Sequence, residues 1–347
     1  MARSTICGLG VGAAGLKPRA SEAPKYVFPQ PVTPFEHEGS NELRGVRTLA
    51  MLELELVFAL LSCSNALAWG PKAHRLINDW AIETLPPEIR GFFQAYRQYL
   101  VEHANDPDEW VKKDRYELMR HYIFLDRYGR FPYLSLPHSY KQAQQEYGAG
   151  RVARNGVLPW QIGEYSLKMT NALKARNWDE ARLDAAVLGY YVADARDPLH
   201  TTENYDGQLV EQSGLETRFG IVLIARYANF FMVRPGDAVK IDDPTEYAFQ
   251  TVLDANTWVN RVLWTDRRSR QGLVDYNDDY YDRFYTQIGS TAARAISEAA
   301  HDTGSYWYTA WLNAGRPSPP ERQISLRSAV RKGSIDLTIV LDHDMLR

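Results

Sequence analysis

The chain has 347 residues, of which 45% are hydrophobic and 24% are charged, and its formal net charge is −3. This composition is sufficient for a sizeable hydrophobic core, and the weak negative charge excludes a protein that binds nucleic acid through a general basic field. Cys7 and Cys63 are the only cysteines, so a disulfide framework beyond Cys63 is excluded as well.

Residues 46–68 are typical of a signal peptide. Arg44 and Arg47 accompany the start of an apolar run of about fifteen residues, which is short for a membrane span and ends in the A-x-A cleavage pattern Ala-Leu-Ala. Cleavage after Ala68 would make Trp69 the first residue of the mature protein. We therefore expect a protein exported to the periplasm or the extracellular space, with no transmembrane span in its mature form.

Two features argue against a simple signal peptide. Glu53 and Glu55 interrupt the apolar run, and the run does not begin near the N-terminus. A translation start near Val46 or Met51 explains the second feature, and residues 1–45, which are rich in Pro, Gly and Glu, would then be a mis-assigned extension. The alternative is a disordered leader with one anchoring helix.

From Trp69 onward the hydrophobic period is mostly helical, and strand signals are few. Helices are predicted over seven stretches: 70–85, 86–104, 159–177, 178–195, 215–231, 246–268 and 280–314. The predicted fold class is therefore all-α, with one multi-helix bundle domain over 69–320. The composition changes after a Pro-rich segment, and 321–347 is predicted to be a flexible tail.

The stretch LGYYVADARDPLH, residues 188–200, resembles part of a metal-binding helix. Asp194 and His200 are six residues apart, and Pro198 should end the helix and turn His200 back toward Asp194. Six residues of ligand type or position stand out along the chain: Trp69, His74, Asp108, His121, Asp194 and His200. Taken singly, each has an ordinary structural explanation, since a lone His is more often a core residue and Asp108 could cap a helix.

Taken together, several motifs resemble the zinc-dependent phospholipase C and single-strand-specific nuclease family. These motifs are Trp-Gly at the mature N-terminus, PDEW, HYIFLD, GYYVADARDPLH, GLETRFG and the closing TGSYWYTAWLNAGRP. The resemblance covers nearly the whole chain after the signal peptide. It implies an all-α bundle with three zinc ions in a cleft, and hydrolysis of phosphoric esters.

The resemblance also implies three ligand sets. One zinc ion would be held by the amino group and carbonyl of Trp69 with His74 and Asp194. A second would be held by Asp108, His121 and Asp194 with a His at position 190, so that Asp194 bridges the pair and Asp108 and Asp194 are catalytic. A water between the two ions would lose a proton and attack phosphorus. A third ion, on the leaving-group side, would be held by His200, a His at position 216 and a carboxylate at position 220.

The sequence departs from the family pattern at three of these ligands, where it has Tyr190, Glu216 and Gly220. Tyr190 could supply a phenolate or a hydrogen bond to a ligand, and Glu216 is a possible weak oxygen ligand. Gly220 has no donor side chain, although acidic residues occur nearby at Glu203, Asp206 and Glu211. Two zinc ions are therefore expected, and the third site is expected to be weak or empty.

Two functions follow from these expectations, and a purely structural helical protein is a third possibility. The first function is an exported zinc-dependent phosphodiesterase, a monomer that hydrolyses phospholipids or single-stranded nucleic acid. The second is a pseudoenzyme that binds zinc or phosphate ligands without turnover. Substrate-binding residues cannot be assigned, although Arg196 could contact phosphate and aromatic residues could stack a base. The candidate aromatics are Tyr190, Tyr191, Tyr205 and Phe219.

Overall fold

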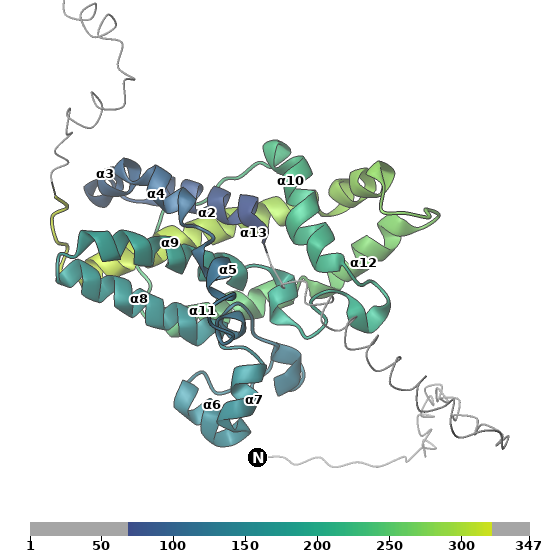
Figure 1. Ribbon diagram of the computed structural model, residues 1–347, viewed down its shortest axis with the longest axis horizontal. Coiled ribbons are helices and arrows are strands. Elements are labelled where there is room, and N and C mark those ends of the chain that lie inside the picture. Colours follow the sequence, from purple (N-terminus) through teal and green to yellow (C-terminus); the bar gives the residue numbers. More distant parts are fainter. Residues whose placement is uncertain (1–68, 321–347) are drawn as a thin grey trace, which may run out of the picture. The chain divides into compact units, whose positions relative to one another are not determined.

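Helices account for all the regular secondary structure in residues 69–320, the part of the chain that the computed structural model describes (Figure 1). These residues lie in one compact unit, and no strand occurs among them. The predicted all-α class is confirmed. The predictions for 1–45, 46–68 and 321–347 lie outside the described residues. Among the described helices, none is long and apolar enough to cross a membrane.

The helices follow one another in a simple order. The first half of the described chain contains α2 (Pro71–Thr84), α3 (Pro87–Ala95), α4 (Arg97–Glu102), α5 (Asp106–Trp110), the 3₁₀ turns η1 (Glu117–Arg120) and η2 (Leu125–Tyr128), α6 (Tyr140–Tyr147), α7 (Ala149–Arg154), α8 (Leu158–Lys174) and α9 (Trp178–Ala195). The second half contains the 3₁₀ turns η3 (Pro198–Thr201) and η4 (Gln208–Val210), the π-helix η5 (Thr217–Leu223), α10 (Ile224–Tyr227), the 3₁₀ turn η6 (Ala228–Phe230), α11 (Pro244–Asn256), α12 (Val259–Arg270) and α13 (Asp278–Asn313).

Four predicted helices have close counterparts in α2, α8, α9 and α13, but the other three are not single α-helices. The stretch 86–104 is broken at Tyr96, whose backbone (φ −110°, ψ 15°) is not helical. The stretch 246–268 is broken after Asn256, whose side-chain amide donates hydrogen bonds to Thr201 and thereby ties the end of α11 to η3. Helices α6 and α7 were not predicted at all.

The third difference is the π-helix in 215–231, which was predicted as an ordinary helix. The carbonyl of Gly220 accepts a hydrogen bond from the backbone N–H of Gly70, 3.0 Å away, and is thereby drawn toward the start of α2. A Cβ added to Gly70 would lie 3.1 Å from the side chain of Ile221, so the two segments are in close contact. The π-helix thus coincides with a tertiary contact to the start of α2.

Helix α13 supplies side chains to two hydrophobic clusters. Trp307 lies in the first cluster, where its ring stacks on Phe93 (centroids 4.8 Å apart) and its indole N–H donates to the Ala185 carbonyl. Ile288 and Ile296 lie in the second cluster, which also contains Trp69. With 36 residues, α13 is about 54 Å long, so one helix spans both clusters.

Helix α2 packs closely against both α9 and α13. A Cβ added to Gly189 of α9 would lie 2.0 Å from Oδ1 of Asn78, and one added to Gly304 of α13 would lie 1.9 Å from Oγ1 of Thr84. The amide of Asn78 also donates to the Ala186 carbonyl of α9 at 3.1 Å. The two close approaches require glycine, and the contact at Gly189 holds the middle of α2 against the C-terminal half of α9.

Candidate metal centre around Asp194

The end of α9 brings three of the predicted ligands together. Asp194 lies in its last turn and His74 lies in the first turn of α2, with 3.5 Å between His74 Nε2 and Asp194 Oδ1. Trp69 immediately precedes α2, and its indole N–H donates to the Ala193 carbonyl at 2.9 Å. The Trp69 backbone lies close enough to raise the pKa of His74, although no hydrogen bond of normal geometry joins them.

Both side chains of the His74–Asp194 pair are buried, and their exposed fractions are 1% and 0%. Burial lowers the pKa of His74 well below its ordinary value, and the neighbouring His121 and His200 lower it further. Burial raises the pKa of Asp194 well above its ordinary value, against the opposing effect of His200. His74 is therefore held as a neutral imidazole, the form that binds metal.

Several nitrogen and oxygen atoms around Asp194 that could bind a metal ion are buried but have no hydrogen-bond partner. They are both ring nitrogens of His74, Nε2 of His121 and both carboxylate oxygens of Asp194. An unsatisfied buried polar atom costs about 1–3 kcal/mol, and a buried carboxylate costs more. A cation bound between His74 and Asp194 would remove the part of this cost that falls on the Asp194 oxygens and on one ring nitrogen of His74, so these two residues fit a metal ion. Their separation of 3.5 Å also matches the spacing of about 3.4 Å between two donors of one tetrahedral zinc ion.

Asp108 and His121 are also brought together, but Tyr190 lies between them. The Tyr190 hydroxyl donates to Asp108 Oδ1 at 2.6 Å and lies 2.8 Å from His121 Nδ1. Both distances are those of hydrogen bonds and are shorter than the spacing of donors around zinc. The Tyr190 ring stacks on His74 with 4.1 Å between centroids. Tyr190 therefore takes the place expected for the second ion.

The protonation of this trio follows from the same contacts. Burial raises the pKa of Tyr190 well above its ordinary value, and Asp194 and Asp108 raise it further, so the phenol keeps its proton. The sequence left open a phenolate ligand at this position, and the environment of the hydroxyl opposes it. Because the O–H donates to Asp108, the contact with His121 requires its Nδ1–H to donate to Tyr190. The pair Asp108 and His121 does not fit a metal ion in this arrangement.

His200 comes back toward Asp194, as Pro198 predicted. Its Nδ1 lies 2.5 Å from the His121 carbonyl and 3.9 Å from Asp194 Oδ2, and its Nε2 lies 3.4 Å from Glu216 Oε1. Burial alone would lower the pKa of His200, but the carboxylates of Asp194 and Glu216 raise it to about 9. His200 therefore lies between the carboxyl groups of Asp194 and Glu216.

Apart from His200 and Glu216, the structure brings no further side chain of the described residues into the ligand set that was expected for the third ion. The Gly220 carbonyl is used by Gly70, and no side chain is present there. Asp206 accepts backbone N–H bonds from Gly214 and Glu216, and Glu203 is paired with Arg127. Across 69–320, no group of three or more His, Cys, Asp or Glu side chains has the arrangement of a complete metal site.

Glu117 is a component of the cluster that the sequence did not indicate. This buried carboxylate accepts hydrogen bonds from Tyr191 and Arg120, and its Oε1 lies 3.5 Å from His121 Nε2. Its position four residues before His121 was the available signal. Glu117 also lines an open pocket of about 320 Å³ together with Trp110 and Tyr165, so this pocket reaches the cluster from the His121 side.

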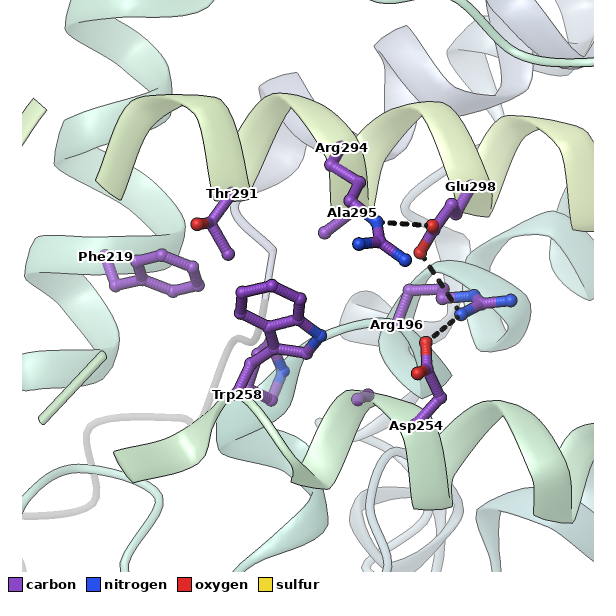
Figure 2. Close-up of a pocket in the computed structure, with 10 residues that line it drawn as sticks. Arg196, Phe219, Asp254, Trp258, Thr291, Arg294, Ala295 and Glu298 are labelled. Atoms are coloured by element: carbon purple, nitrogen blue, oxygen red, sulfur yellow. Dashed lines mark hydrogen bonds and ion pairs between the residues drawn. The ribbon is translucent and has the colours of Figure 1, made fainter. Parts of the chain in front are cut away.

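Arg196, which the sequence offered as a phosphate contact, is engaged by carboxylates of the protein itself. Its guanidinium donates to Asp302 at 2.6 Å and to Asp254 at 2.8 Å, and Figure 2 shows it also directed toward Glu298. Burial alone would lower the pKa of Arg196, but these carboxylates raise it above its ordinary value. Tyr191 and Phe219, which were considered as stacking residues, are fully buried.

Comparison of the sequence with protein-family models and with curated proteins gave no match.

Proposed function

We propose that this chain is a zinc-binding protein whose ion is held by His74, Asp194 and the backbone of Trp69. The observation that carries this proposal is the buried pair His74–Asp194, whose donor atoms have no hydrogen-bond partner. The ion would supply positive charge to Asp194 and would join the start of α2 to the end of α9. The helical body would then be of the zinc-dependent phospholipase C and nuclease type that the motifs resemble.

Of the two functions that the sequence left open, the geometry favours the pseudoenzyme. Hydrolysis by a pair of metal ions requires both ions of the pair, and the Tyr190 hydroxyl bonds to two ligands of the second. His200 and Glu216 form an ion pair in place of a third site. In this proposal the protein binds one zinc ion and turns over no phosphodiester.

Phosphodiester hydrolysis is the second candidate, and one observation favours it. His121 Nδ1 lies 3.8 Å from Asp194 Oδ2, and Asp108 is half-buried, so both ligands of the second ion remain beside the first. Movement of Tyr190 alone would release them. The substrate would then be a phospholipid or single-stranded nucleic acid, as the resemblance implies, and the protein would act after export.

The test uses secreted protein whose N-terminal sequence starts at Trp69. We expect one zinc ion per chain by elemental analysis and no hydrolysis of bis-p-nitrophenyl phosphate. Asp194→Asn should lose the zinc. The matched control is Asp184→Asn, an identical change of a buried carboxylate on the same helix outside the cluster, which should keep it. Unchanged zinc in Asp194→Asn would refute the site, and two zinc ions with turnover would replace the first candidate by the second.

A further inference from the structure

The C-terminal half of α12 forms a basic pocket. Trp264, Arg267, Arg268, Arg270 and Gln271 line a pocket of about 450 Å³ at this end of the helix. In Figure 1 α12 and α8 lie at opposite ends of the described helices. The residues that line the pocket include none of those gathered around Asp194, so the two sites are separate.

Helix α12 has one buried and one exposed face. Val262, Asp266 and Ser269 are buried against the rest of the domain. Trp264 and Arg268 lie four residues apart on the outer face, where the guanidinium stands 5.3 Å from the centre of the indole ring. The Trp264 side chain is nevertheless 58% exposed, which is unusual for the largest apolar side chain.

The positive charges of this pocket are not neutralised within the protein. Arg267 donates to the Val210 carbonyl at 3.3 Å and Arg270 donates to the Leu273 carbonyl at 2.5 Å. In the described part of the chain, no carboxylate lies within ion-pair distance of Arg267, Arg268 or Arg270. By contrast, Arg218 is paired with a buried carboxylate. Unpaired guanidinium groups beside an exposed ring indicate an anionic partner.

Exposed aliphatic side chains flank the arginines. The contact of Arg267 with Val210 places η4 beside α12, and Leu209 in this turn is 62% exposed. The contact of Arg270 with Leu273 fixes the segment after α12, where Val274 is 85% exposed. Glu211 and Asp275 follow these apolar residues in the sequence and are exposed. Asp278 and Asp279, further along the same segment, are exposed as well, and none of the four forms an ion pair with Arg267, Arg268 or Arg270.

We propose that Leu209, Trp264, Arg267, Arg268 and Val274 form a docking surface for anionic phospholipid membranes. Arginine attracts lipid phosphates, tryptophan is suited to the interface between water and lipid, and aliphatic side chains gain free energy by entering the acyl region. Single-stranded nucleic acid also binds arginine and tryptophan, but its bases stack on aromatic rings and give no role to Leu209 and Val274. The proposal is independent of the cation site.

Vesicle sedimentation tests this docking surface with the whole secreted protein. We expect binding to vesicles of phosphatidylcholine with 30% phosphatidylglycerol, weaker binding at high salt, and little binding to phosphatidylcholine alone. The double variant Arg267→Glu/Arg268→Glu should weaken partitioning by about 25-fold or more, since each surface arginine contributes about 5-fold. Trp264→Ser should weaken it at every salt concentration.

The matched control is Lys141→Glu/Lys174→Glu, which makes the same change of charge at exposed positions of α6 and α8. Equal loss in this control would show a general charge effect and would overturn the docking surface. Failure of the unaltered protein to bind anionic vesicles would also overturn it. So would binding of a single-stranded oligonucleotide through Arg267 and Arg268 with no vesicle binding. Far-UV circular dichroism of each variant excludes unfolding as the cause.

Discussion

Removal of the Tyr190 hydroxyl separates its structural role from its effect on metal binding. In Tyr190→Phe the hydrogen bonds to Asp108 and His121 are lost, while the ring can still stack on His74. A hydrogen bond to a carboxylate contributes about 1.5–3 kcal/mol and a neutral one about 1 kcal/mol. Because Asp108 is half-buried and can be rehydrated, we expect a net loss of about 2–3 kcal/mol in the free energy of unfolding without metal.

Zinc should offset this loss in the variant. Without the hydroxyl, Asp108 and His121 are free to bind a second ion with Asp194, and an ion at about 100 times its dissociation constant stabilises the folded state by about 2.7 kcal/mol. The assay is urea unfolding with chelator and with zinc, together with zinc content per chain. The matched control is Tyr191→Phe, since the Tyr191 hydroxyl donates to the Glu117 carboxylate from the next position of α9. Equal losses with and without zinc in Tyr190→Phe would refute the view that the hydroxyl excludes the second ion.

Two further predictions concern the helices that carry the site. Gly189→Ala should destabilise the protein by about 2–4 kcal/mol, because the new methyl group would lie 2.0 Å from Asn78 Oδ1 and would disturb its hydrogen bonds. The control is Gly91→Ala on α3, where nothing lies within 4 Å of the added methyl group, and it should stabilise the protein by about 0.5–1 kcal/mol. Equal urea midpoints for these two variants would contradict the close contact of α2 and α9. Asp184→Asn should stabilise the protein at pH 7. Burial raises the pKa of Asp184 to about 6, so the folded state binds its proton more tightly than the unfolded state and is penalised as the pH rises from about 4 to 6. This pKa shift corresponds to at most about 3 kcal/mol in the free energy of unfolding, reduced to about 1–2 kcal/mol by solvent screening. The increase in stability of Asp184→Asn should vanish near pH 4. An increase that does not depend on pH would exclude this carboxylate as its source.

The sequence predicted which of the candidate residues come together better than it predicted the hydrogen bonds that they form. The period over 178–195 gave the bounds of α9, and Pro198 predicted that His200 returns to Asp194, because both signals are local. The hydroxyl of Tyr190 could not be placed in this way. Its bonds to Asp108 and His121 join residues that are 82 and 69 positions away, and they exist only after three segments have packed together.

Breaks within the predicted helices had the same kind of cause. The end of α11 coincides with the contact of Asn256 with Thr201, and the π-helix coincides with the hydrogen bond from Gly70 to Gly220. Neither partner is near in sequence, so hydrophobic period alone could not reveal them. Glu117 was missed because a single acidic residue before a histidine is common on solvated helix faces, and only the packing of Tyr191 and Arg120 shows that it is buried.

The length of α13 has a consequence for how the domain comes apart. Trp307 and Ile296 belong to different hydrophobic clusters but to one continuous helix. Loss of packing in either cluster therefore destabilises α13, against which the other cluster also packs. Separate loss of the two clusters would require a break within α13, which contains no proline. The residues around Asp194 adjoin both hydrophobic clusters. We therefore expect this site to be lost only when the whole domain unfolds, in one cooperative step.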